Sequence, residues 1–257
     1  MKRFTLIFLS IFMMGALMAQ QGQGSGGTYT GGNMGTQGNT VLYEQMNPQS
    51  YHVASQQFLD INNSVAQVAD DFTVPADKYW IIDHVECYGQ YFGGTPAGPA
   101  TAFTVEIYVD DFSNGLIPAS TPIQVRSELT YSEASGLFTI DLGSAPFKLL
   151  PGHYWISIYA EQNYSSAKQW GWAWSNDPQV GNMAVNRDPD HVITNPTWPD
   201  TWDMASTTWP TTTEADLSFR LIGADGSSAV PVSNWAIIFG VLLIGIFMTV
   251  RYRRSLA

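Results

Sequence analysis

The chain has 257 residues, with 11 lysine and arginine residues against 22 aspartate and glutamate residues, and a formal net charge of −11. Six of the basic residues and all 22 acidic ones lie between residues 20 and 229, so this part carries a net charge of −16. Such an acidic surface repels nucleic acid and anionic lipid headgroups, and we expect no nucleic-acid partner. A single cysteine excludes an intramolecular disulfide, but a domain of about 180 residues is large enough to be stable through its apolar core alone.

Residues 1–19 have the pattern of a secretory signal peptide. A basic pair, Lys2 and Arg3, precedes a mostly apolar run that ends at Ala19. This run is too short to span a membrane, so we expect cleavage after Ala19. Residues 20–40 are rich in glycine and glutamine and lack the apolar content for packing, which predicts a disordered linker.

Residues 41–223 are predicted to form the ectodomain, with its core in residues 65–222. Apolar and polar residues alternate in short runs separated by glycine, proline and asparagine, as in half-buried strands. Eight or nine such runs predict an all-β fold, an antiparallel β-sandwich with jelly-roll-like connectivity. The predicted core residues are Phe103, Val105, Ile107, Phe138, Ile140, Ile156, Ile158, Phe219 and Leu221.

Two of these runs predict which residues face outward. In the run 103–109, we expect Glu106 and Tyr108 on the outer face. In the run 79–88, alternation predicts one face with the apolar Ile81, Val85 and Cys87. Its other face would carry His84 and Glu86. We interpret Cys87 as a small buried residue rather than a reactive thiol.

Three tryptophans lie at every second position of one run, Trp170, Trp172 and Trp174, and therefore share one face of a strand. An aromatic face of this kind is typical of a sandwich core. The alternative is a flat platform on which sugar rings stack.

A second set of tryptophans, Trp198, Trp202 and Trp209, lies in a loop rich in proline and threonine. Loops run over the surface and often carry binding residues. The indoles and the neighbouring Asp200 and Asp203 could therefore bind an extracellular glycan, with the carboxylates accepting hydrogen bonds from sugar hydroxyls. The alternative is a long loop that its indoles hold against the sandwich.

Calcium is the metal ion that the sequence favours. Asp110, Asp111 and Asn114 offer oxygen ligands on a turn that follows a predicted strand, although the spacing is not that of an EF-hand. The alternative is a hairpin turn whose aspartate and asparagine side chains cap the backbone.

The sequence contains no motif of a common catalytic or cofactor site. The four histidines are far apart and lack the His-Glu-x-x-His spacing of zinc enzymes, and His153 lies in a turn where a structural role is expected. Neither a nucleophile elbow nor a phosphate-binding loop is present. We therefore predict that the protein is not an enzyme and has no cofactor apart from the calcium considered above.

The C-terminal end has the pattern of a membrane anchor. After a short linker, 224–231, residues 232–250 form a charge-free stretch of 19 residues, close to the ~20 that a membrane-spanning helix needs. The basic tail 251–257 is expected to stay in the cytoplasm, which places the preceding domain outside. The basic residues are Arg251, Arg253 and Arg254.

Residues 65–222 resemble a β-sandwich module of bacterial secreted surface proteins. The resemblance implies the sandwich fold and no catalytic residues. It rests on the following segments in this order: Ala69–Pro75, Val85–Gly89, Phe103–Val109, Phe138–Leu142, Leu150–Trp155, Gln169–Trp172 and Asp216–Phe219.

The C-terminal segment resembles the bacterial sorting signals of the PEP-CTERM and IPTL-CTERM kind. Pro231 and Trp235 precede the apolar stretch and the arginine cluster, although in the IPTL form the proline lies one residue further from the tryptophan. The resemblance implies a membrane-embedded sorting peptidase that cuts near the proline. The alternative is a permanent single-pass anchor.

Together these features predict an exported protein of the bacterial cell surface with a structural or adhesive function. The first alternative is a carbohydrate-binding module that uses the loop tryptophans. The second is a surface-associated glycan hydrolase, which would need two carboxylates facing each other across a cleft at about 5–10 Å.

Overall fold

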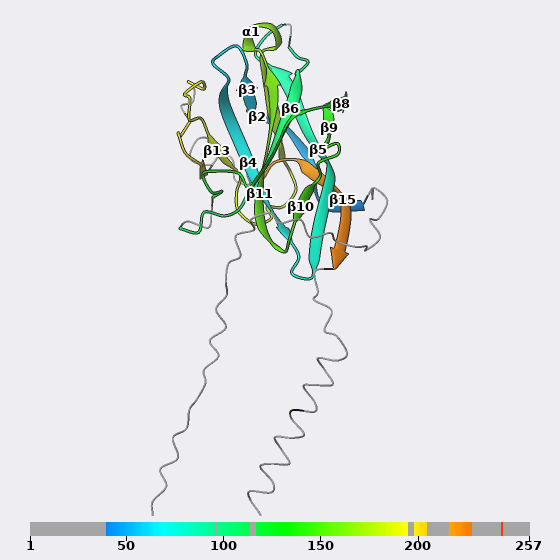
Figure 1. The fold of residues 1–257 in the computed structure, drawn as a ribbon. Coiled ribbons are helices and arrows are strands. Elements are labelled where there is room, and N and C mark those ends of the chain that lie inside the picture. Colours follow the sequence, from blue (N-terminus) through cyan, green and yellow to red (C-terminus); the bar gives the residue numbers. More distant parts are fainter. Residues whose placement is uncertain are drawn as a thin grey trace, which may run out of the picture. The chain divides into compact units, whose positions relative to one another are not determined.

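Nearly all regular structure of the domain is β-strand, arranged in two sheets (Figure 1). Among the described residues between 40 and 227 there is one helix, α1, Tyr164–Ala167. This arrangement confirms the predicted all-β sandwich. The computed structural model describes residues 40–95, 97–113, 117–194, 198–204, 216–227 and Leu243.

The first sheet is built around the long strand β5, Lys78–Phe92. One edge of β5 pairs first with β15 and then with β12, and its other edge pairs with β10 and β9. The other strands of this sheet are β1 (Thr40–Gln45), β2 (Pro48–Ala54), β8 (Tyr131–Ala134), β9 (Leu137–Asp141), β10 (Phe147–Leu149), β12 (Gln169–Ser175) and β15 (Phe219–Ser227).

The second sheet is built around the strands β4 (Ser64–Val74) and β11 (Gly152–Gln162), which pair with each other. The pairing of β3 with β11 is parallel, whereas all other pairings between described strands are antiparallel, so the sandwich is not wholly antiparallel as predicted. The remaining strands are β3 (Gln56–Phe58), β6 (Ala102–Tyr108), β7 (Gln124–Leu129), β13 (Val185–Arg187) and β14 (Asp203–Met204).

The main core lies between the two sheets. All nine predicted core residues are fully buried, at 0% exposure. Trp170 from the first sheet packs edge-on against Phe103 from the second, with ring centroids 5.0 Å apart. Trp172 and Trp174 are buried in the same cluster, so the core interpretation of these tryptophans is confirmed.

A β-bulge reverses the predicted alternation at the start of β5. The pairing with β15 passes from His84 opposite Ile222 to Ile82 opposite Gly223, which leaves Asp83 as an extra residue. Ile82 is therefore fully buried and Ile81 only half-buried, and the prediction for Ile81 was wrong. Beyond the bulge, Val85 and Cys87 are buried as predicted.

A second, smaller apolar cluster lies on the outer face of the second sheet. It contains Tyr108, Trp155 and Trp202, the last of which comes from the loop before β14. Tyr108 and Glu106 face outward from β6 as predicted, but they are buried there: Tyr108 has 0% exposure beneath Trp202, and Glu106 has 8%. The described residues thus form two apolar clusters, one between the sheets and one beneath this loop.

The predicted membrane-associated ends lie almost wholly outside the described residues. The structure describes nothing of residues 1–39, and only Leu243 of the predicted span 232–250. Among the described residues, none of the helical structure is long and apolar enough to cross a bilayer.

Candidate binding site

The loop tryptophans lie inside the domain rather than on its surface. Trp198 has 3% exposure and Trp202 has 5%. The Trp202 ring packs edge-on against Tyr108 at 5.5 Å between centroids, and the Arg187 guanidinium lies 4.2 Å above its centre. Neither indole offers an open face to a sugar, which favours the alternative that these side chains hold the loop in place. Trp209 lies outside the described residues.

The two carboxylates of the same loop point into solvent. The side chain of Asp200 is 70% exposed and lies 3.7 Å from the His191 ring. Asp203 is exposed and accepts a hydrogen bond from the backbone N–H of Met204 at 2.8 Å. These carboxylates therefore do not form one ligand surface with the buried indoles.

The predicted calcium ligands are engaged in separate hydrogen bonds. Asp110 accepts hydrogen bonds from the His153 ring at 2.7 Å and from the Trp155 indole N–H at 2.9 Å. Asp111 accepts from the backbone N–H and the hydroxyl of Ser113, which is the turn-capping alternative. Asn114 lies outside the described residues, and the described His, Cys, Asp and Glu side chains form no group of three suited to a metal ion.

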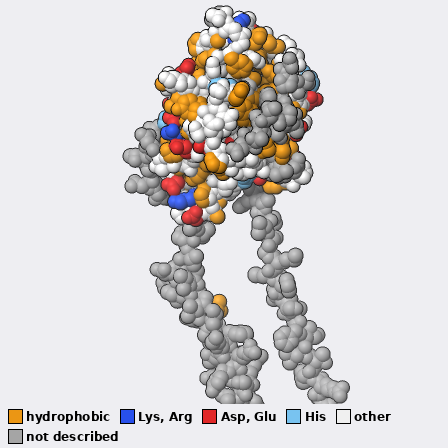
Figure 2. All heavy atoms as spheres, turned by 180° about the vertical axis from the view of Figure 1, so that it is seen from behind, with side chains coloured by type: hydrophobic (Ala, Val, Ile, Leu, Met, Phe, Trp, Pro, Cys, Tyr) orange, Lys and Arg blue, Asp and Glu red, His pale blue; other side chains and the backbone are white. Residues whose placement is uncertain are grey.

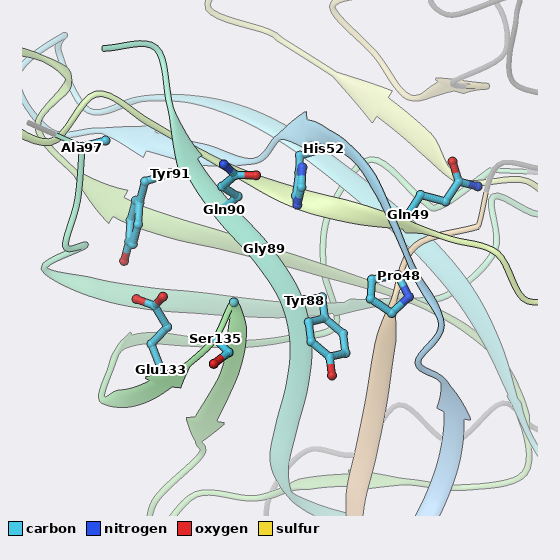
Figure 3. Close-up of a pocket in the computed structure, with 11 residues that line it drawn as sticks. Pro48, Gln49, His52, Tyr88, Gly89, Gln90, Tyr91, Ala97, Glu133 and Ser135 are labelled. Carbon is cyan, nitrogen blue, oxygen red and sulfur yellow. The ribbon is translucent and has the colours of Figure 1, made fainter. Parts of the chain in front are cut away.

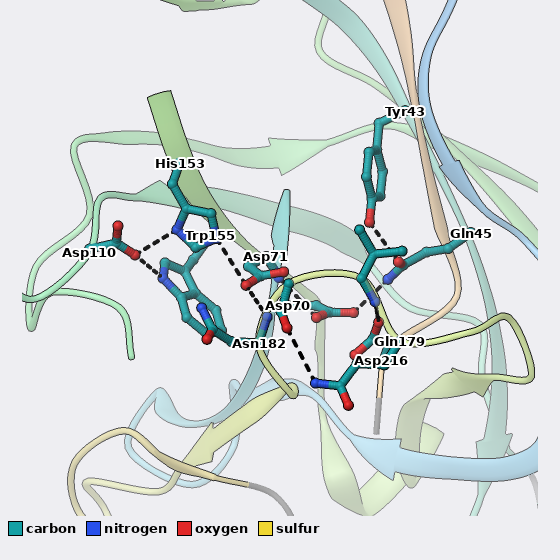
Figure 4. A network of polar contacts seen from close by, with 12 residues as sticks. Tyr43, Gln45, Asp70, Asp71, Asp110, His153, Trp155, Gln179, Asn182 and Asp216 are labelled. Carbon is teal, nitrogen blue, oxygen red and sulfur yellow. Dashed lines mark hydrogen bonds and ion pairs between the residues drawn. The ribbon is translucent and has the colours of Figure 1, made fainter. Parts of the chain in front are cut away.

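His153 links Asp71 of β4 to Asp110, just after β6, in a network that sequence analysis did not predict (Figure 4). One ring nitrogen lies 2.7 Å from Asp110, and the other lies 2.9 Å from Asp71. These hydrogen bonds, chiefly that to Asp71, raise the pKa of His153 to about 9 despite its partial burial. Asp71 also accepts a hydrogen bond from the backbone of Asn182 at 2.6 Å, so the network holds the loop after β12 against the sheet.

The neighbouring Asp70, on β4, is wholly buried and connects β1 with the segment before β15. Its carboxylate accepts hydrogen bonds from the Gln45 amide and from the Leu217 backbone N–H, both at 2.6 Å. Burial, and secondarily the nearby Asp216 carboxylate, raise the pKa of Asp70 well above its usual range. With these donors already bound, Asp70 is a structural group that fixes β1 and the segment before β15.

A groove on the outer face of the first sheet is the best candidate for a binding site (Figure 3). It has a volume of about 530 Å³ and opens to solvent. Tyr88 and Gln90 extend into it from β5, His52 lines it from β2, and Glu133 and Ser135 come from the β8–β9 hairpin. Sequence analysis did not identify this site, because its residues come from three separate parts of the chain.

Beside the groove, small residues of β12 let a neighbouring ring lie close against the sheet. The strand β12 lies between β5 and β2, and its outward positions are Gly171, opposite Gln90, and Ala173, opposite His52. Both residues are nevertheless buried, and the ring of Phe92 from β5 lies over Gly171. A Cβ atom on Gly171 would lie 2.5 Å from the ring of Phe92, so a larger residue would displace its neighbours.

The β8–β9 hairpin, which lines one side of the groove, is fixed to β5. Ser135 and Gly136 both have positive φ angles, 55° and 80°, as a two-residue type I′ turn requires. The backbone N–H of Gly89 donates to the carbonyl of Gly136 at 2.9 Å. Gly89 itself lies against the Trp170 indole, where an added Cβ would be only 2.5 Å from the ring. The groove therefore rests directly on the aromatic core.

The groove is almost uncharged at neutral pH. Burial lowers the pKa of His52 below its usual value, so its imidazole is neutral. Among the described lining residues, Glu133 carries the one formal charge. On the face seen in Figure 2, carboxylates are scattered among apolar and uncharged polar atoms, with few basic side chains.

The polar groups of the groove differ from those of the His153 network. The Tyr88 hydroxyl, the Gln90 amide and the Ser135 hydroxyl have no hydrogen-bond partner among the described residues, and all three line the groove. In the His153 network, by contrast, the carboxylates of Asp71 and Asp110 already accept hydrogen bonds from protein groups. The groove is therefore the place where a ligand finds free donors and acceptors.

Comparisons with known proteins indicate no function for this chain. No model of a known protein family matches the chain, and neither the curated proteins nor the solved structures contain a match. The sorting-signal residues Pro231 and Trp235 and the arginine cluster lie outside the described residues. The arginines of this cluster are Arg251, Arg253 and Arg254.

Proposed function

We propose that this chain is an exported protein of the bacterial cell surface whose sandwich acts in adhesion or matrix attachment, without catalysis. In this proposal residues 1–19 are a signal peptide, residues 232–250 are a membrane anchor, and the sandwich has jelly-roll-like connectivity. The ectodomain has six basic and 22 acidic residues, so an anionic membrane surface repels it. This repulsion supports display of the domain as a soluble unit away from the membrane.

The observation that carries the proposal is the position of the groove relative to the point of attachment. β15 ends at Ser227, which pairs with Lys78 at the first residue of β5, and the predicted anchor follows in the sequence. The groove lies around Tyr88 and Gln90, near the last residue of the same strand. At about 3.3 Å per strand residue, the two ends are roughly 30–40 Å apart.

The chain also enters and leaves the sandwich on neighbouring strands. Thr40, the first residue of β1, pairs with Gly223 of β15. The linker and the predicted anchor therefore both join the sandwich through the β1–β15 pair. An attachment of this kind leaves the groove at the free end of the domain, where a partner outside the cell can reach it.

Two epitope tags on the full chain test export and anchoring together. One tag is inserted within the linker 20–40, and the matched control tag follows Ala257. We expect antibody to label the linker tag on intact cells, or on spheroplasts if the domain stays in the periplasm, and the C-terminal tag only after permeabilisation. A linker tag that is labelled only after permeabilisation of spheroplasts contradicts export.

The same experiment separates a permanent anchor from processing by a sorting peptidase. If the segment near Pro231 is cut, the linker tag is found on a shorter chain that lacks the C-terminal tag. If the anchor is permanent, both tags stay on one chain. A Trp235→Ala variant is the control for recognition, because it changes the motif without adding charge to the apolar stretch.

A further inference from the structure

We propose that the open groove between β2, β5 and the β8–β9 hairpin binds a neutral oligosaccharide. This inference rests on the proposed function, because it names the kind of molecule to which the displayed domain would attach. It does not involve the loop tryptophans, whose indoles are buried.

The size and shape of the groove suit a small segment of a glycan chain. Its volume of about 530 Å³ lies within the range of roughly 300–1,000 Å³ that is usual for small-molecule sites. It opens to solvent along a sheet face, so a sugar chain can lie across it without entering a closed cavity.

The lining combines flat rings with free polar groups. Tyr88 and His52 supply rings from opposite walls, and such rings can pack against the C–H face of a sugar. The Gln90 amide offers donors and an acceptor, Ser135 offers a hydroxyl, and Glu133 offers an acceptor. Vicinal sugar hydroxyls, each a donor and an acceptor, match this set.

Charge decides between a neutral and an anionic glycan. No lysine or arginine is among the described lining residues, while Glu133 is negative. The part of the chain from residue 20 to residue 229 carries six basic and 22 acidic residues, a net charge of −16. A sulfated or uronic-acid sugar would therefore meet repulsion and no counter-charge.

The central strand of the groove offers no free edge to a peptide in extended conformation. Such a peptide binds by adding a strand to an exposed sheet edge, through main-chain hydrogen bonds. β5 lies at the centre of the groove and pairs with β12 on one side and with β9 on the other. Its backbone groups are thus already bonded to neighbouring strands, so a ligand over β5 meets side chains, and strand addition is left to the edge strands β2 and β8.

The test measures glycan binding by the full chain, purified in a zwitterionic detergent without sugar headgroups. The probes are a printed array of neutral gluco-, manno-, galacto- and N-acetylglucosamine oligosaccharides, with uronic-acid and sulfated oligosaccharides beside them. Any neutral sugar that binds is then titrated by calorimetry against three variants, Tyr88→Ala, Gln90→Ala and the matched control Tyr79→Ala. Tyr79 lies on the same strand near Ser227, far from the groove, and is 38% exposed.

We expect binding to neutral oligosaccharides that becomes at least about tenfold weaker in Tyr88→Ala and in Gln90→Ala and is unchanged in Tyr79→Ala. Gln90 is exposed, so its variant keeps the test valid if Tyr88→Ala does not fold. Binding restricted to anionic sugars, no binding to any neutral sugar, or equal binding by wild type and both groove variants overturns the proposal. Capture of an extended peptide at the groove in place of sugar overturns it as well.

Failure of this inference is distinguishable from failure of the proposed function. The binding assay uses purified protein and does not depend on where the chain resides in the cell. The tag experiment reports location and does not depend on any ligand. If the chain is exported but binds no sugar, the proposed surface location stands and the glycan proposal fails. If the chain binds sugar but is not exported, the glycan proposal stands and the proposed surface location fails.

Discussion

The hydrogen bonds of His153 predict a specific dependence of stability on pH. The two ring nitrogens lie 2.7 Å from Asp110 and 2.9 Å from Asp71. Both nitrogens can donate a hydrogen bond to a carboxylate at the same time only when the imidazole is protonated. The pKa of His153 is accordingly raised from 6.5 to about 9, chiefly by Asp71.

The direction of this pKa shift determines how stability changes with pH. A group with a raised pKa in the folded state stabilises the fold fully below its unfolded pKa, here 6.5, and loses that contribution as pH rises through about 9. The two pKa values correspond to about 3 kcal/mol, at 1.36 kcal/mol for each pH unit. Because the His153 side chain is 26% exposed and partly screened by water, we expect about 1–2 kcal/mol.

The variant His153→Gln removes the titrating group and keeps one donor. Urea unfolding of the full chain, followed by tryptophan fluorescence between pH 6 and pH 10, gives the free energy of unfolding. We expect the variant to be less stable than wild type by about 1–2 kcal/mol at pH 6, and this difference to shrink towards pH 10. The matched control is His191→Gln, whose side chain is 62% exposed and lies 3.7 Å from Asp200.

Comparison with wild type at each pH removes the contribution of the other titrating groups. A difference that stays constant from pH 6 to pH 10 would refute the argument, because it would show that His153 acts through packing alone. A difference of zero at pH 6 would refute the hydrogen-bonded network itself.

Three further predictions concern packing, and each is measured by urea unfolding of the full chain. Gly89→Ala should lower the free energy of unfolding by about 1–3 kcal/mol because the new Cβ would lie 2.5 Å from the Trp170 ring. Adding Trp170→Phe should restore part of this loss, and simply additive effects of the two substitutions would count against the contact. Ile107→Ala should lose about 2–5 kcal/mol because Ile107 is fully buried, and an unchanged midpoint would contradict its place in the core. Trp202→Ala should lose about 2–4 kcal/mol because the ring packs on Tyr108 and Arg187, and full stability would show that the loop does not depend on it.

The central strands could be predicted from the sequence because their alternation is regular. Phe103, Val105 and Ile107 lie two residues apart, and all three are fully buried. This pattern fixes the face that the strand turns to the core. It does not show what covers the other face, and Tyr108 is buried there by a loop almost 100 residues further along the chain.

The strands β1 and β3 were not predicted, and each buries a polar side chain. Gln45 has 3% exposure and Gln56 has 0%. The Gln56 amide oxygen accepts a hydrogen bond from the Trp170 backbone at 2.9 Å, and its amide nitrogen donates to the Lys168 carbonyl at 3.2 Å. A buried glutamine with its own partners gives no hydrophobic periodicity, so sequence alone does not separate such a strand from a loop.

The candidate site could not be predicted because it exists only after the strands are assembled. Tyr88 and Gln90 alternate with inward residues like any outward pair, and His52 lies more than 30 residues earlier in the chain. By contrast, the conspicuous loop tryptophans 198 and 202 are buried and have a structural role.

The central claim is that the groove at the free end of the displayed sandwich attaches the cell to a neutral glycan. The most direct measurement is the number of cells retained under flow on a surface coated with the neutral oligosaccharide that the purified chain binds, with equal antibody labelling of the linker tag in every strain. The account predicts that cells with the Gln90→Ala chain detach while cells with wild type or Tyr79→Ala remain. Equal retention of all three strains at equal surface labelling would contradict it.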